Sequence, residues 1–316
     1  MKHPLVSVSC ITYNHSSYIR QCLDGFVMQK CDFAFEVLIH DDASTDDTQE
    51  IIKEYQAKYP EIIKAVLQKE NQYSKGIRGI SPRFNFPRAQ GKYIAMCEGD
   101  DYWTDPLKLQ KQVDILERFP EVDICAHPSF RLYGEDLRQD GYGYWGNEAH
   151  IISAAKVVQN HASNAGLQSI MFRKKSLDAL SDIIKVQMGG HSTIQIFYSL
   201  PNGLYYLPDY MSVYRVASSS SISKMLFKND AAYLERQRKN WKGLELLNQH
   251  FQFQYDTLFR RALRKRVLHV ISSGYLNMTQ ILGLVKEFEL GGELKNLLRS
   301  VGVGFMRKLR NRYKKK

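Results

Sequence analysis

The 316-residue sequence contains no two cysteines at the spacing of a metal-binding or redox pair, and it contains no long apolar run. Its five cysteines include no CxxC pair and lie within apolar segments, so we expect buried thiols in a reducing compartment and no zinc site. No segment approaches the roughly 18 apolar residues that a membrane-spanning helix requires, and the N-terminus lacks the pattern of a secretory signal. These absences argue against disulfide-stabilised secreted proteins and membrane-spanning proteins, and they predict a cytoplasmic location.

Acidic residues are scarce in the last third of the chain. The net charge is +11, yet residues 1–101 carry 12 Lys/Arg and 14 Asp/Glu, residues 102–223 carry 11 and 12, and residues 224–316 carry 21 and 7. This asymmetry predicts a near-neutral domain over residues 1–223 and a basic region over residues 224–316.

The first 120 residues alternate short β-rich apolar runs with helical patterns. The strand-like runs are "LVSVSCIT", "FEVLIHDDA", "IIKAVLQ" and "KYIAMC", and helical segments such as "TDDTQEIIKEYQAK" and "PLKLQKQVDILERF" separate or follow them. Strands that alternate with helices of ten or more residues predict an α/β fold with a mainly parallel sheet flanked by helices.

Polar clusters follow three of the predicted strands: Thr12-Tyr13-Asn14, Asp41-Asp42 and Glu98-Gly99-Asp100-Asp101. Ligands of parallel sheets bind at the carboxyl ends of the strands, so we expect all three clusters at one edge.

The third cluster places three carboxylates within four residues, and such groups raise each other's pKa unless a cation lies among them. A divalent cation that shares its ligands with a phosphate is one interpretation. A solvated acidic turn before a helix is the other, with Asp105 as N-cap and Pro106 at the first helical position.

In combination, "VSVSCITYN", "FEVLIHDDASTDDT", "RAQGKYIAMCEGDDYWTDPLKLQKQVDIL" and, more weakly, "YYLPDYMSVYR" resemble the family 2 glycosyltransferases. The resemblance is strong over about 120 residues, weaker to about residue 215, and absent beyond. It implies a GT-A (Rossmann-like) fold, with a C-terminal helical region outside the resemblance. It further implies an inverting, metal-dependent glycosyltransferase of bacterial surface-polysaccharide synthesis, which moves a sugar from a nucleotide diphosphate-sugar, expected to be a UDP-sugar, to a glycan or lipid-linked acceptor.

The same resemblance implies roles for individual residues. Glu98-Gly99-Asp100 stands where the family has its DxD motif, so Asp100 would hold Mn²⁺ or Mg²⁺ and contribute to catalysis. The expected donor-binding residues are Thr12, Tyr13, Asn14, Asp41, Asp42, Arg83, Glu98 and Asp100, with Lys75 and Arg78 as further basic candidates in the Arg83 loop.

The expected catalytic base is a departure from the family pattern. Relatives carry an aspartate before an apolar helix, whereas this chain has His191 there. A neutral imidazole is a competent base near pH 7. Contact with the acceptor or metal, or a structural role, are the other interpretations of His191, and Asp209 is a second candidate base. Arg215 either approaches the diphosphate or lies at the edge of the core.

The basic C-terminal region has helical periodicity, with Arg260, Arg261, Arg264 and Lys265 largely opposite an apolar face. Such a pattern is typical of peripheral binding to an anionic membrane surface, here the inner face of the cell membrane. Packing on the catalytic domain or within a homodimer is the alternative. No nucleic-acid-binding module is recognisable, which disfavours a nucleic-acid partner. A non-catalytic nucleotide-sugar-binding subunit stays open as a second function.

Overall fold

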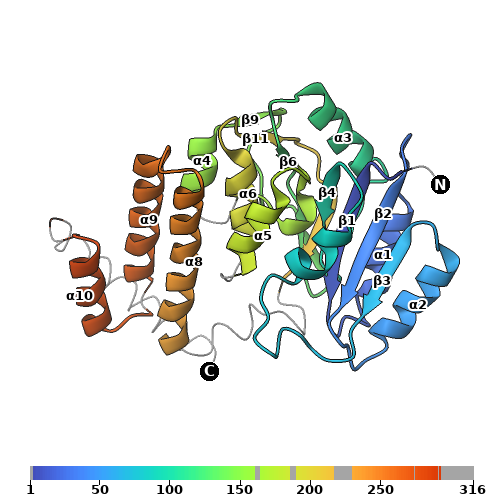
Figure 1. Ribbon diagram of the computed structural model, residues 1–316, viewed down its shortest axis with the longest axis horizontal. Helices are drawn as coiled ribbons and strands as arrows, with labels where there is room; N and C mark the ends of the chain where they lie inside the picture. Colours follow the sequence, from blue (N-terminus) through green and yellow to red (C-terminus); the bar gives the residue numbers. More distant parts are fainter. Residues whose placement is uncertain are drawn as a thin grey trace. The chain divides into compact units, whose positions relative to one another are not determined.

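The computed structural model describes residues 3–160, 164–185, 190–216, 230–273, 275–290 and 292. The chain divides into two compact units, Met1–Ser221 and Ile222–Lys316 (Figure 1). The roles predicted for the two regions of the sequence stay predictions.

The described part of the first unit is built on an eight-stranded sheet in the order β3-β2-β1-β4-β10-β6-β11-β9. The parallel part consists of β3 (Ile63–Leu67), β2 (Phe35–Asp41), β1 (Val6–Thr12) and β4 (Tyr93–Met96). The sheet continues through β10 (Met171–Arg173), β6 (Ile124–Ala126), β11 (Leu204–Tyr206) and β9 (His150–Ile152). Because β10 runs antiparallel to both β4 and β6, the sheet is mixed beyond β4. The predicted α/β fold with a mainly parallel sheet is confirmed.

A smaller sheet has the order β5-β12-β7-β8. Its strands are β5 (Tyr102–Trp103), β12 (Ser212–Arg215), β7 (Phe130–Tyr133) and β8 (Asp136–Arg138). Strand β5 directly follows the acidic cluster and pairs antiparallel with β12, whose last residue is Arg215. The second sheet thus brings residues about 110 positions apart next to the acidic cluster.

The helices of this unit are α1 (Ile19–Val27), α2 (Thr48–Lys58), α3 (Lys108–Arg118), α4 (Ala154–Gln159), α5 (Leu177–Lys185) and α6 (Gly190–Ser199). Short turns η1 (Ser81–Asn85), η2 (Phe86–Arg88) and η3 (Leu167–Ser169) complete it. Amphipathic α1 buries Ile19, Leu23 and Phe26 because they recur on one helical face. The predicted Asp105 N-cap is wrong: α3 begins at Lys108, and the Asp105 carboxylate instead accepts the Leu107 N–H at 2.8 Å.

Strand β1 is buried on both faces, as expected for a central strand of a parallel sheet. Val6, Val8 and Cys10 face the apolar core. The alternate residues Ser7 and Ser9 are buried with polar partners, since the Ser7 hydroxyl donates to Glu36 at 2.7 Å and Asn85 donates to Ser9 at 3.1 Å. All five cysteines are free thiols; four are buried and Cys31 is half-buried.

Lys108 is completely buried in α3. Its ammonium donates to Gln112 Oε1 at 2.6 Å and lies 4.1 Å from the centre of the Trp103 ring. Burial lowers the pKa of Lys108 to about 7, because a low-dielectric interior disfavours the charged form.

Replacing Lys108 by methionine is therefore expected to flatten the dependence of stability on pH. In the folded protein Lys108 loses its proton near pH 7, whereas in the unfolded chain a lysine keeps its proton up to about pH 10. Between these pH values the unfolded state binds more protons than the folded state, so the free energy of unfolding of the wild type rises with pH. Urea unfolding at pH 7 and pH 9 should show a gain about 2–3 kcal/mol larger for the wild type than for Lys108→Met. Lys53→Met, at an exposed position of α2, should behave like the wild type. Equal gains for all three proteins would show that Lys108 stays protonated in the folded state.

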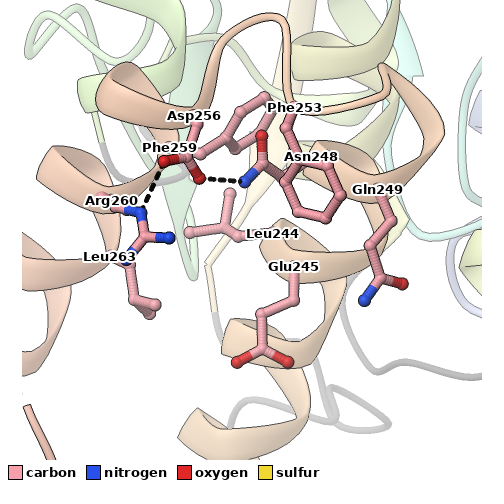
Figure 2. A pocket seen from close by; sticks show the side chains of 9 residues that line it. All are labelled: Leu244, Glu245, Asn248, Gln249, Phe253, Asp256, Phe259, Arg260 and Leu263. Atoms are coloured by element: carbon pink, nitrogen blue, oxygen red, sulfur yellow. Dashed lines mark hydrogen bonds and ion pairs between the residues drawn. The ribbon is translucent and has the colours of Figure 1, made fainter.

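The second unit contains α8 (Asp230–His250), α9 (Asp256–Ile271) and α10 (Met278–Glu287). Helices α8 and α9 form an antiparallel hairpin (Figure 1), and Trp241, Val267 and Leu284 belong to their shared apolar core with α10. Figure 2 shows a pocket of about 260 Å³ on this hairpin, where Asp256 accepts hydrogen bonds from Asn248 and Arg260. Within the described residues, no helix is sufficiently long and apolar to cross a bilayer.

Candidate active site

The three polar clusters meet at one edge of the large sheet. Strand β1 lies between β2 and β4 and is parallel to both, so their carboxyl ends are adjacent. Two backbone hydrogen bonds extend these pairings past the strands: Asp42 N–H donates to Thr12 O at 3.0 Å, and Gly99 N–H donates to Ile11 O at 2.9 Å. The predicted meeting of the three clusters is confirmed.

The loops after β1 and β2 are joined by side chains. Asn14 N–H donates to the Ser44 hydroxyl at 2.9 Å, and Thr45 N–H donates to the Asn14 side-chain oxygen at 2.8 Å. His15 N–H donates to the Thr48 hydroxyl at 2.8 Å. Asn14 has a φ of 53°, an uncommon left-handed conformation that this network holds. The two loops therefore form one rigid platform.

Asp41, at the end of β2, is fully buried. Its Oδ1 accepts hydrogen bonds from Ser44 N–H at 2.9 Å and from Gln49 Nε2 at 2.6 Å, and its Oδ2 accepts the Ser44 hydroxyl. Oδ1 thus accepts two hydrogen bonds and Oδ2 accepts one, so Oδ2 keeps a second lone-pair site for a ligand N–H.

Asp42 contacts a different segment. Its two carboxylate oxygens accept the N–H groups of Gln72 at 2.8 Å and Tyr73 at 3.0 Å, and its backbone oxygen accepts the Asn71 amide at 2.9 Å. These contacts fix the start of the basic loop, the segment that carries Lys75, Arg78 and Arg83. The structure thus gives Asp42 a loop-anchoring role that the sequence did not predict.

The basic loop carries Lys75, Arg78 and Arg83. Lys75 forms an ion pair with Glu70, and the Arg78 guanidinium lies 4.0 Å from the Tyr73 ring centre. Arg83 is exposed, and its Nε donates to Arg78 O at 2.9 Å. Of the three cations, Lys75 is thus neutralised by an acid, while Arg78 and Arg83 contact an aromatic ring and a carbonyl.

The acidic cluster is not a solvated turn. Glu98 and Asp100 are half-buried, and Asp101 is 1% exposed. Burial, reinforced by the charge of Asp100, raises the pKa of Glu98 to about 7 and raises that of Asp101 well above its usual range. Asp101 Oδ1 accepts a hydrogen bond from the backbone N–H of Arg215 at 2.8 Å, so Asp101 joins the cluster to β12.

Arg215 supplies the positive charge at this cluster. Its guanidinium lies 5.0 Å from the Tyr18 ring centre and 4.7 Å from the Tyr102 ring centre. One terminal nitrogen donates to Asp100 O and the other to Gln21 Oε1. Arg215 therefore lies beside the acidic cluster, and its approach to a diphosphate stays a prediction.

Gly99 lies between the two half-buried carboxylates with no room for a side chain. A Cβ there would lie 2.8 Å from both Cβ and Oγ1 of Thr12 and 3.0 Å from His15 Nδ1. Thr12 Oγ1 and His15 Nδ1 are buried, and no described residue forms a hydrogen bond with either atom. The close packing at Gly99 therefore sets the positions of Glu98 and Asp100.

The two carboxylates suit a hard divalent cation, because Mg²⁺ and Mn²⁺ take oxygen ligands and commonly bind through one or two carboxylates plus substrate phosphates. Among the described residues, no three His, Cys, Asp or Glu side chains are grouped as metal ligands. The donor set thus fits a metal whose remaining ligands come from a diphosphate and water.

The candidate bases are less closely tied to this cluster. His191 is the second residue of α6 and is half-buried, and its role stays a prediction. Asp209 Oδ1 lies 3.4 Å from Lys111 Nζ, so this carboxylate already has a cationic partner. Tyr13 is 40% exposed on the β1 loop, with a ring accessible for stacking.

Sequence reasoning missed Tyr142. Tyr142 is half-buried, and its ring centre lies 5.3 Å from that of Tyr214. Burial raises the pKa of Tyr142, and the charges of Tyr214, Asp101 and Glu98 raise it further. Its flanking glycines both have positive φ values. The glycine-aromatic run "DGYGYWG" was the available signal, in a segment without a recognisable motif.

The mainly parallel sheet, with the acidic loop at its carboxyl edge, has the architecture of the GT-A class of glycosyltransferases. The chain belongs to glycosyl transferase family 2, whose family model matches residues 7–181.

The chain is 35% identical over 212 residues to an uncharacterized protein of Mycobacterium tuberculosis, a match that covers 66% of this chain and 58% of that protein's length. It resembles the structure of residues 1–349 of TarS from S. aureus in complex with UDP-GlcNAc, with a TM-score of 0.58, 17% identity, and coverage of 98% of this chain and 92% of that one. A mannosyltransferase of Pyrobaculum calidifontis in complex with GDP-Man and Mn²⁺ has a TM-score of 0.50 and 16% identity, covering 95% and 86%. At these identities the solved structures support the fold.

Proposed function

We propose that this chain transfers a sugar from a nucleotide diphosphate-sugar, a UDP-sugar, to a hydroxyl of a glycan or lipid-linked acceptor, in the synthesis of a surface polysaccharide. The observation that carries the proposal is the acidic cluster, Glu98 to Asp101, joined at one sheet edge to the β1 and β2 loops and to Arg215. TarS, which shares the fold, is described in complex with UDP-GlcNAc and with UDP.

In the proposed mechanism Tyr13 stacks on the nucleobase, and the platform of Thr12, Asn14 and Asp41 orients the nucleoside. Asp100 would hold Mn²⁺ or Mg²⁺, which supplies Lewis-acid stabilisation of the departing diphosphate. Arg83 contributes positive charge from the basic loop. Glu98 faces the hydroxyl groups of the donor.

His191 takes the proton of the acceptor hydroxyl. The acceptor oxygen attacks the anomeric carbon as the bond to the diphosphate oxygen breaks, so the configuration inverts in a single displacement. The nucleotide diphosphate leaves with the electron pair of the broken bond, and no covalent enzyme intermediate forms.

Calorimetric titration of a nucleotide-sugar panel, with and without Mn²⁺, tests the donor site. We expect one UDP-sugar to bind with a metal-dependent affinity. Failure of every donor to bind under all metal conditions would overturn the proposed function.

The base assignment predicts a difference between two substitutions of His191. His191→Ala should lower kcat by about 10²–10⁴-fold while leaving donor affinity unchanged, because general-base catalysis contributes that much to the rate. His191→Asp should retain activity and move the acidic limb of the pH profile to lower pH, because a carboxylic acid gives up its proton at lower pH than an imidazolium does. Unchanged turnover in His191→Ala would refute this assignment. Donor binding without turnover in the wild type would instead favour the non-catalytic subunit.

We propose that the second unit attaches the enzyme to the inner face of the cell membrane. Arg260, Arg261, Arg264 and Lys265 are exposed on α9, and each basic residue near an anionic surface contributes about 1 kcal/mol. The further basic residues between 293 and 316 lie outside the described residues. Homodimer formation stays a prediction.

A further inference from the structure

One cation of α9 does not share the exposed face of its neighbours. Arg266 is 5% exposed and lies on the buried face of α9 with Val267 and Val270. An arginine retains its charge under all ordinary conditions, and burial of a charge is costly unless an acceptor compensates it.

The part of the chain that the structure describes supplies no such acceptor to two of the three guanidinium nitrogens of Arg266. Among the described residues, neither its Nε nor its Nη2 has a hydrogen-bond partner, and no ion pair includes it. Arg260, six residues earlier on the same helix, instead pairs with Asp256 at 2.6 Å (Figure 2). The N–H groups on Nε and Nη2 point from the same edge of the guanidinium, the fork that binds carboxylate or phosphate in a bidentate manner.

A second buried donor lies at the same level of the helical hairpin. Trp241 is 3% exposed, and its indole N–H has no hydrogen-bond partner within the described parts of the chain. Trp241 precedes the last residue of α8 by nine positions and Arg266 follows the first residue of α9 by ten. At 1.5 Å per residue these distances from the connecting turn nearly match, and Trp241 shares an apolar core with Val267, which follows Arg266.

We propose that Arg266 and Trp241 form a binding site for an oxyanion of the phosphate type within the second unit. Nε and Nη2 of Arg266 and the indole nitrogen of Trp241 are all donors, which disfavours a cation as the ligand of these two side chains. A tetrahedral phosphate offers oxygens to both the guanidinium fork and the indole. With 21 Lys/Arg against 7 Asp/Glu in residues 224–316, the region attracts anions. A free phosphate and a phospholipid headgroup both carry this chemistry.

Thermal unfolding with inorganic phosphate tests the site directly. Ten millimolar phosphate should raise the Tm of the wild type by about 2 °C or more and leave Arg266→Met unchanged. Without phosphate, Arg266→Met should melt no lower than the wild type, because it removes an unpaired buried charge. Arg261→Met, which removes an exposed arginine of the same helix, should respond to phosphate as the wild type does.

Vesicle flotation separates the two sources of the phosphate group. Binding to vesicles that contain phosphatidic acid, but not to phosphatidylcholine vesicles, should be weakened by Arg266→Met more than by Arg261→Met if the headgroup enters the site. A difference between the two variants in either assay supports the site, and the assay that shows it identifies the source. Equal behaviour of the two variants in both assays would overturn the proposal.

Arg266→Lys keeps the charge and lacks the fork, so it should lose most of the phosphate-induced rise in Tm. It serves as the test variant if Arg266→Met does not fold. Nucleotide-sugar titration of the same proteins should give unchanged donor affinity, so failure of this proposal and failure of the proposed function are distinguishable.

Discussion

Replacing Asp100 by asparagine should lower kcat/KM for the donor by about 10²–10³-fold, the cost typical of losing one electrostatic contact to the charge that develops in a transition state. The substitution preserves shape and removes the negative charge that would hold Mn²⁺ or Mg²⁺. Steady-state kinetics across a Mn²⁺ titration measure the effect, and the metal dependence should disappear with the activity.

Asp101→Asn is the matched control, because it makes the same chemical change one residue away. Asp101 is buried, its pKa is raised, and its Oδ1 accepts the Arg215 N–H. An amide oxygen can accept the same hydrogen bond, so we expect only a few-fold change in kcat/KM. Equal losses in the two variants would indicate that the cluster is needed for its structure and not for a metal.

Gly99→Ala is expected to lower kcat/KM by about 10²-fold without unfolding the protein. The added Cβ would lie 2.8 Å from Thr12 Cβ, at the end of a buried central strand. Since β1 cannot move away, the loop that carries Glu98 and Asp100 must move, and a displacement of about 1 Å at a reacting centre costs on this order. Overpacking of this kind should lower stability by about 1–3 kcal/mol.

Kinetics and urea unfolding of Gly99→Ala test this prediction together. Gly283→Ala in α10 is the control, because a Cβ there meets no atom within 4 Å and alanine favours a helix. It should leave kcat/KM unchanged. A Gly99→Ala protein with wild-type donor affinity and turnover would exclude the acidic cluster from the donor site.

The sequence predicted the positions of β1, β2 and β4 because their apolar runs are short, continuous and followed by polar residues. The gathering of their ends followed from the rule for parallel sheets, and both are confirmed. The start of α3 was wrong because a local pattern of Asp105 and Pro106 was taken for a cap.

Contacts between distant residues could not be predicted in this way. Arg215 reaches Asp100 across 115 positions, and Asp42 holds the N–H groups of Gln72 and Tyr73. Neither contact leaves a periodic signal, because it depends on how the strands and loops are placed in three dimensions.

By itself, therefore, the sequence determined the α/β class, the order of the three polar clusters and their resemblance to one glycosyltransferase family. Local periodicity and strand-end chemistry are encoded within a few residues of each site. The tertiary structure alone decided that Asp101 is buried while Asp100 is half-buried and that Arg215 lies beside them. It alone also decided that Arg266 is buried with no acid paired to it among the described residues. Burial and charge pairing decide these roles, and both depend on residues that are far apart in the chain.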